Sequence, residues 1–145
     1  MKTALFTGTF NPFTIGHADI VERSLTLFDK VVIGIGYNPE KATSDIEERV
    51  AAIQRVYKDN PRVTVEAYND LTVELAKRHN ASAIVKGVRS VKDFEYEREQ
   101  AEFNKLLGDG LETVLFFAKP ELTAISSTTV RQLKQFGKDI TPFLP

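Results

Sequence analysis

The chain has no cysteine among its 145 residues, which excludes disulfides, thiolate nucleophiles and sulfur-ligated metal sites together. It has no apolar run long enough for a membrane span, and the apolar stretch after Met1 is too short for the core of a signal peptide. It also has no excess of one charge, because the formal net charge is −1. We therefore expect a cytoplasmic protein without nucleic-acid or membrane partners, in which a local cluster of donors holds any bound anion.

The length and the ordinary composition predict a single domain over residues 1–145. With 42% hydrophobic and 27% charged residues, the chain has the balance of a globular protein that buries a sizeable core. No repeat, low-complexity tract or linker-like stretch divides it.

Short apolar stretches alternate with longer amphipathic ones along the chain. The expected strands are 3–7, 31–36, 63–67, 83–85 and 113–118, and the expected helices are 16–28, 44–57, 71–79, 93–107 and 127–136. This alternation predicts an α/β fold, a single-domain Rossmann-like doubly wound sheet of about five parallel strands with helices on both faces. In such sheets ligands bind beyond the carboxyl ends of the strands, where the strand order reverses.

The loop after the first expected strand runs from Gly8 to His17 and contains several groups that suit a phosphate. Gly8 allows a sharp turn, and Gly16 lies where the next helix begins and presents free N–H groups. Thr9 adds a hydroxyl and His17 an imidazole. The alternative is a tight turn with a half-buried histidine, but the convergence of these groups in one loop favours an anion site.

Cations follow two other expected strands. Lys86 and Arg89 flank Gly87 at the end of an apolar run, where Arg89 suits bidentate contact with phosphate and Lys86 acts as a point charge. Taken alone, two solvated surface cations would be the likelier interpretation. Lys41 is a weaker candidate for contact with a second substrate.

Four consecutive hydroxyls, Ser126 to Thr129, open the last expected helix. They are typical of a helix N-cap, and they also form a donor-rich site for a triphosphate. Arg131, one turn further on, either reaches the same anion or faces water.

These motifs together carry a family resemblance. Thr-Ile-Gly-His at 14–17, Gly-Val-Arg-Ser-Val-Lys-Asp-Phe-Glu-Tyr-Glu at 87–97, Ile-Ser-Ser at 125–127 and the closing Asp-Ile-Thr-Pro-Phe-Leu-Pro at 139–145 span the whole length. The chain resembles the nucleotidyltransferase superfamily with the (H/T)-x-G-H signature, and within it the phosphopantetheine adenylyltransferase family.

The resemblance implies a reaction and a set of site residues. It implies transfer of the adenylyl group of ATP to 4′-phosphopantetheine, giving dephospho-coenzyme A and pyrophosphate. Mg²⁺ is then bound mainly through the ATP phosphates, with no metal ligand from protein side chains, and the assembly is a homohexamer. His17 becomes the transition-state stabiliser. The implied ATP positions are Thr9, Phe10, His17, Gly87, Val88, Arg89, Glu97, Leu122, Thr123, Ala124, Ile125, Ser126, Ser127 and Thr128. The implied acceptor positions are Thr9, Lys41, Thr72 and Lys86.

Three features depart from the family pattern. Asn11 stands where aspartate is usual, which removes a negative charge near the ATP phosphates, and Lys86 stands where arginine is commoner. The sequence closes at Pro145, short of the further C-terminal helix that many members carry, so the assembly could differ.

Two rival functions remain open at this point. One is another nucleotidyl transfer, as in nicotinamide mononucleotide adenylyltransferases or cytidylyltransferases, which share the first loop. The other is a non-catalytic nucleotide-binding sensor on the same fold. Retention of Lys41, Lys86 and Arg89 beside His17 favours the enzyme, because binding alone does not require two converging anion sites.

Overall fold

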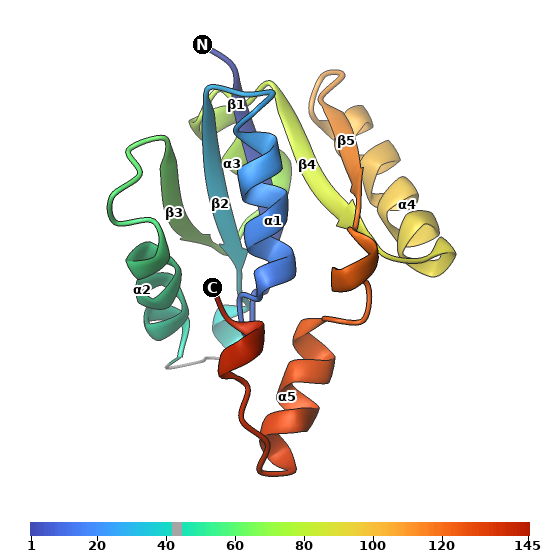
Figure 1. The fold of residues 1–145 in the computed structure, drawn as a ribbon. Coiled ribbons are helices and arrows are strands. Elements are labelled where there is room, and N and C mark those ends of the chain that lie inside the picture. Colours follow the sequence, from blue (N-terminus) through green and yellow to red (C-terminus); the bar gives the residue numbers. More distant parts are fainter. Residues whose placement is uncertain (42–44) are drawn as a thin grey trace.

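Five parallel strands form one sheet in the computed structural model, which describes residues 1–41 and 45–145. The strands are β1 (Thr3–Gly8), β2 (Lys30–Gly36), β3 (Val63–Tyr68), β4 (Ala83–Val88) and β5 (Glu112–Phe117), in the order β3-β2-β1-β4-β5 (Figure 1). The order reverses beside β1, because the chain crosses from β3 to the other side of β1 before it forms β4. The predicted α/β sheet is confirmed, and the loops after β1 and β4 flank its switch point.

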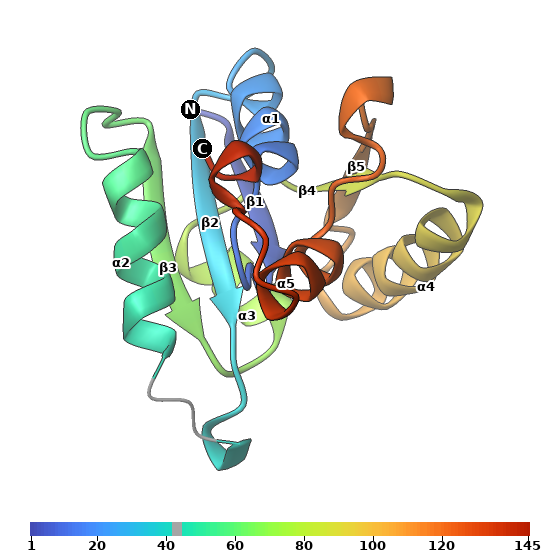
Figure 2. The same ribbon diagram turned by 60° about the horizontal axis from the view of Figure 1, so that its bottom comes forward.

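Helices cover both faces of this sheet. They are α1 (Ile15–Ser24), α2 (Ile46–Val56), α3 (Thr72–Arg78), α4 (Val91–Leu107) and α5 (Ser127–Gln135), with short 3-10 turns at Pro39–Lys41, Pro120–Leu122 and Thr141–Phe143. α1 and α2 pack on one face, and α3 and α4 lie together on the other. α5 and the C-terminal segment lie beyond the carboxyl ends of the strands, at the bottom of Figure 1 and toward the viewer in Figure 2.

The core follows from the alternation of side chains along the strands. In β1, Ala4 and Phe6 point into the cluster under α1 and α2, whereas Leu5 points into the cluster under α3. All three are at most 3% exposed, as suits a strand covered on both faces. Full burial of a side chain such as Leu5 stabilises the fold by about 1.5–3 kcal/mol, so β1 anchors the loop that follows it.

Two boundaries differ from those that the sequence predicts. β4 extends to Val88, with Lys86 and Gly87 paired to Leu115 and Phe116 of β5, so Lys86 lies within the strand and not after it. A lysine inside a strand breaks the apolar pattern, which is why the sequence ends this strand at Val85.

α1 ends at Ser24, short of the predicted end at residue 28. The Ser24 hydroxyl donates to the Ile20 carbonyl, and the Arg62 guanidinium donates to the carbonyls of Leu25 and Phe28, 2.6 and 2.9 Å away. These side-chain donors satisfy the carbonyl groups of a terminating helix. The predicted start of the second helix, at residue 44, lies outside the described residues.

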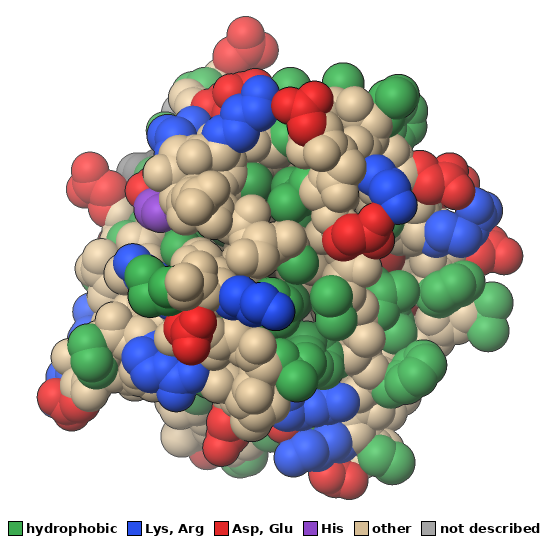
Figure 3. All heavy atoms as spheres, turned by 90° about the horizontal axis from the view of Figure 1, so that it is seen from above, with side chains coloured by type: hydrophobic (Ala, Val, Ile, Leu, Met, Phe, Trp, Pro, Cys, Tyr) green, Lys and Arg blue, Asp and Glu red, His purple; other side chains and the backbone are tan. Residues whose placement is uncertain are grey.

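The surface carries both signs of charge. Basic and acidic side chains are interspersed on the face in Figure 3, which looks down on the molecule from the top of Figure 1. Within residues 1–41 and 45–145, no helix combines the length and the apolar character that crossing a membrane requires.

Candidate active site

The first turn of α1 fixes the orientation of His17. Thr14 is the N-cap, and its hydroxyl accepts from the His17 backbone N–H at 3.4 Å. In return the Thr14 N–H donates to Nδ1 of the His17 ring at 2.9 Å, which completes a capping box. Because Nδ1 is an acceptor, the proton of the neutral ring lies on Nε2.

The surroundings of His17 keep its ring neutral. Burial lowers its pKa from 6.5 to about 4, and the positive charges of Lys86 and Arg89 act in the same direction. The rings of Phe10 and Phe13 lie 5.0 and 5.4 Å from the imidazole, centroid to centroid, and supply the apolar contact. His17 is therefore a fixed Nε2–H donor at neutral pH.

This depressed pKa predicts a pH-dependent loss of stability. As the pH falls below 6.5, an unfolded chain protonates at this histidine while the folded chain does not until about pH 4. We expect the free energy of unfolding to fall by up to about 1 kcal/mol per pH unit across that window, through this residue alone. Urea unfolding of the wild type and of His17→Gln from pH 4 to 7 measures it. Parallel stability curves for the two proteins would contradict the prediction.

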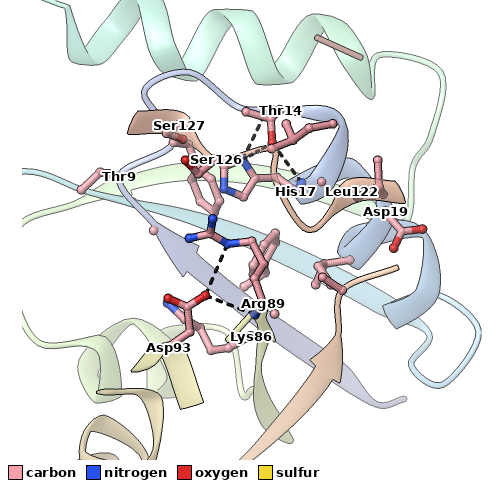
Figure 4. A pocket seen from close by; sticks show the side chains of 18 of the residues that line it. Thr9, Thr14, His17, Asp19, Lys86, Arg89, Asp93, Leu122, Ser126 and Ser127 are labelled. Atoms are coloured by element: carbon pink, nitrogen blue, oxygen red, sulfur yellow. Dashed lines mark hydrogen bonds and ion pairs between the residues drawn. The ribbon is translucent and has the colours of Figure 1, made fainter. Parts of the chain in front are cut away.

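His17, Arg89 and the start of α5 face one cavity of about 300 Å³ (Figure 4). The cavity lies between the loop after β1, the end of β4 and the segment that leads into α5. The predicted ATP residues that line it are Thr9, Phe10, His17, Gly87, Arg89, Glu97, Leu122, Ile125, Ser126, Ser127 and Thr128. Val88, Thr123 and Ala124 are not among its lining residues, because Val88 is buried in β4 and the other two are exposed beside η2 (Pro120–Leu122).

A carboxylate holds each of the two predicted cations. Asp93 lies one helical turn from Arg89 and accepts from its backbone N–H at 3.1 Å, and its carboxylate forms an ion pair with Nε at 3.3 Å. Lys86 pairs with Glu97 at 3.3 Å and donates to the Thr7 carbonyl at 3.0 Å. Both cations are thus oriented from α4, and neither is a freely solvated surface charge.

A second cavity of about 390 Å³ adjoins the first. Three of the predicted acceptor residues, Thr9, Thr72 and Lys86, line it together with Tyr68 and Asn104. The Thr72 hydroxyl lies 3.0 Å from the Tyr68 hydroxyl. The side chain of the fourth, Lys41, lies outside the described part of the chain. Both cavities share Thr9, Lys86 and Glu97, so the two spaces meet at these residues.

The hydroxyls at the start of α5 serve the fold as well as the cavity. Ser126 is the N-cap and accepts from the Thr129 N–H at 3.1 Å, while the Ser127 hydroxyl donates to the Pro12 carbonyl at 2.7 Å. Arg131 is exposed to solvent, and its guanidinium also has a structural role. Its guanidinium donates to the Asn11 carbonyl at 2.6 Å and to the Thr128 hydroxyl at 3.2 Å, so it joins α5 to the first loop.

Comparison with known proteins identifies the family. Residues 5–133 match the model of the cytidylyltransferase-like family. Phosphopantetheine adenylyltransferases of Phocaeicola vulgatus and Bacteroides fragilis are 55% and 53% identical over 146 residues, covering 100% of this chain and 96% and 97% of theirs. The chain belongs to the phosphopantetheine adenylyltransferase family.

Membership of this family makes the protein a nucleotidyltransferase and confirms the family predicted from its motifs. A solved bifunctional NMN adenylyltransferase/ADP ribose pyrophosphatase from Francisella tularensis shares the fold, with a TM-score of 0.70 at 20% identity. The match covers 99% of this chain and 44% of the bifunctional one.

The carboxylates of the adenylyltransferase site are paired with cations. Asp19, 8% exposed, pairs with both Arg23 and Lys119 at 3.1 Å, and Asp93 and Glu97 pair with the cations described above. In the part of the chain that the structure describes, histidine, aspartate and glutamate side chains form no cluster of three that could hold a metal ion.

The sequence does not predict the roles of several residues at this site. Asp93 contacts Arg89, which lies four positions earlier, and Thr14 contacts His17, which lies three positions later. Such short offsets along the sequence could have revealed both residues. Asp19, Tyr68 and Asn104 reach the cavities only through the packing of distant elements, and no local pattern marks them.

Proposed function

We propose that the enzyme transfers the adenylyl group of ATP to 4′-phosphopantetheine, giving dephospho-coenzyme A and pyrophosphate. The observation that carries this proposal is the pair of adjoining cavities with Thr9 and Lys86 at their junction. A reaction between two anionic substrates requires two such spaces that meet at a cluster of donors. The relatives named above supply the identity of the acceptor.

The chemistry requires no protein nucleophile or base. The second pKa of a phosphate monoester is near 6, so the acceptor phosphate is already largely dianionic at neutral pH. One of its oxygens bonds to the α-phosphorus of ATP, the bond from that phosphorus to the bridging oxygen breaks, and pyrophosphate leaves with both electrons of that bond. The protein positions the reactants in line and stabilises the charge that develops.

Each functional group has a place in this scheme. ATP occupies the cavity beside His17, whose Nε2–H donates to an oxygen of the α-phosphate as negative charge builds there. Arg89 and the N–H groups at the start of α5 hold the β- and γ-phosphates. Lys86 and Thr9 hold the acceptor phosphate at the junction, and its pantetheine arm extends between Tyr68 and Asn104.

Mg²⁺ enters this scheme as part of the nucleotide substrate. The carboxylates near the site are committed to cations, so its own residues suit MgATP better than a metal held by the protein. The ion would neutralise phosphate charge that the protein leaves uncompensated. Since the reaction consumes ATP, we infer that the enzyme acts in the cytoplasm.

The proposal is tested by measuring pyrophosphate release with different substrate pairs. ATP with 4′-phosphopantetheine is expected to give rapid release. ATP with nicotinamide mononucleotide, and CTP with phosphocholine, are expected to give none above background. Activity with one of those pairs instead would identify another nucleotidyl transfer. ATP binding without release with any acceptor would identify a nucleotide sensor.

We further infer that the protein self-associates through α4. This helix has 17 residues and none of them is buried, and it exposes Val91, Phe94, Tyr96, Phe103, Leu106 and Leu107. It projects from the body of the molecule (Figure 2), and this many exposed apolar side chains on one helix mark an interaction surface. The likeness to the family supports six copies.

Leu106→Glu tests this assembly. Leu106 is 78% exposed and lines neither cavity, so the substitution is expected to lower the average mass in sedimentation velocity without unfolding the chain. Gln54→Glu adds the same charge on the exposed face of α2 and is expected to leave the mass unchanged. A wild-type monomer, or equal masses for both variants and the wild type, would contradict the inference.

A further inference from the structure

The backbone of Thr9 is held from the side by an arginine of α2. Nη1 of Arg49 donates to the Thr9 carbonyl at 2.7 Å, a contact that spans 40 positions of the sequence. Nη2 of the same guanidinium lies 3.4 Å from the carboxylate of Asp45, one helical turn earlier. The Arg49 side chain is only 14% exposed, so the guanidinium is packed in place behind the loop.

The loop after β1 depends on such contacts because its backbone is irregular. Phe10 adopts φ 48°, a left-handed conformation that a phenylalanine rarely takes. Arg131 and Ser127 of α5 hold the carbonyls of Asn11 and Pro12, and Arg49 holds that of Thr9. The loop is thus fastened from two sides, by α5 on one side and by α2 on the other.

Thr9 is one of the residues whose placement matters for both substrates. It lines the cavity that contains His17 and also the cavity that contains Thr72. Arg49 lines neither cavity, so it has no direct route to a substrate. Its influence on the reaction passes through the Thr9 backbone.

We propose that Arg49 is a positioning residue for adenylyl transfer: its hydrogen bond to the Thr9 carbonyl fixes the junction at which the acceptor phosphate meets the α-phosphate. The proposal rests on the proposed function. In-line attack is sensitive to displacements of about 1 Å, so a loosened junction lowers turnover more than it weakens the binding of either substrate. ATP keeps Arg89 and the start of α5, and the acceptor keeps Lys86.

Three variants separate this role from a merely structural one. Arg49→Gln removes the charge and the forked donor, and Arg49→Lys retains a cation that can donate one hydrogen bond to Thr9. Arg55→Gln makes the same change at an exposed position of the same helix and serves as the control. Each is assayed for pyrophosphate release with both substrates varied, and its thermal unfolding is recorded.

We expect Arg49→Gln to lower kcat by about tenfold or more, the usual effect of losing a charged hydrogen bond, with both KM values within about threefold of wild type. Arg49→Lys is expected to recover most of that loss, and Arg55→Gln to match the wild type. An unchanged kcat in Arg49→Gln overturns the proposal. A loss of kcat in Arg49→Gln that Arg49→Lys does not relieve, and that parallels the fall in Tm, also overturns the proposal.

Hydrogen exchange gives a readout that does not depend on the acceptor. The peptide covering residues 8–17 is expected to exchange faster in Arg49→Gln than in Arg55→Gln, because the loop is released on the α2 side. Equal exchange overturns the proposal even if the wild type uses another acceptor. Failure of the wild type to release pyrophosphate with 4′-phosphopantetheine, in contrast, refutes the proposed function alone.

Discussion

Replacing His17 with alanine is expected to lower kcat by about 10² to 10³, the usual loss when one preorganised donor to a developing charge is removed. The residue is a neutral Nε2–H donor whose Nδ1 is engaged by the Thr14 N–H at 2.9 Å. A donor fixed in this way stabilises charge that increases on the α-phosphate in the transition state more than the charge already present in bound ATP. The Kd of ATP is therefore expected to change much less than kcat.

Alanine also removes half of the capping box, so a matched variant is required. Glutamine at this position can still accept from the Thr14 N–H, as glutamine does in capping boxes, but presents no ring nitrogen to the cavity. We expect His17→Gln to unfold near the wild-type temperature and still to lose most of its turnover. Pyrophosphate release at saturating substrates and calorimetric titration with ATP give the two quantities. Losses of equal size in kcat and in ATP affinity would refute the role assigned to His17.

The fold could be predicted from the sequence because its central strands, β1 and β2, are buried on both faces. Each of the five strands is a short, mostly apolar stretch between helical ones, and that pattern alone indicates a parallel sheet. The errors lie at element ends. Lys86 belongs to β4 although a charged side chain is more typical of a loop. Inside the fold, its ammonium group donates to the Thr7 carbonyl and pairs with the Glu97 carboxylate. The spacing of residues along one segment does not reveal such partners.

The candidate site could be predicted in part, for a related reason. His17, Arg89 and Ser126 each lie after a strand, and the carboxyl ends of parallel strands meet at one edge of a sheet, so their convergence follows from the topology. Arg49 and Arg131 carry no such signal. Each acts on a backbone carbonyl of the first loop, 40 and 120 positions away, and only packing brings it there. Sequence reasoning therefore finds the groups that face a ligand more readily than those that hold them in place.

Lys86→Ala is expected to raise the Michaelis constant for the acceptor by about 10- to 100-fold, the range for losing a charged hydrogen bond, and to raise that for ATP far less. Lys86 lies at the junction of the two cavities, where the acceptor phosphate is proposed to bind. Steady-state kinetics with each substrate varied at saturation of the other measure both constants. A larger rise for ATP than for the acceptor would count against the assignment.

The carboxylate of Glu97 complicates this experiment and also provides its control. Glu97 is 12% exposed and pairs with Lys86 at 3.3 Å, so the alanine variant leaves a negative charge facing two anionic substrates. In Lys86→Ala/Glu97→Gln that charge is gone, and any recovery in the Michaelis constant for the acceptor measures repulsion by Glu97. The loss that remains measures the contact from Lys86 itself. Lys86→Arg keeps the charge and is expected to stay near the wild type, because the guanidinium can also reach the Thr7 carbonyl and Glu97. Complete recovery in the double variant would mean that Lys86 serves only to neutralise Glu97 and does not bind the acceptor phosphate.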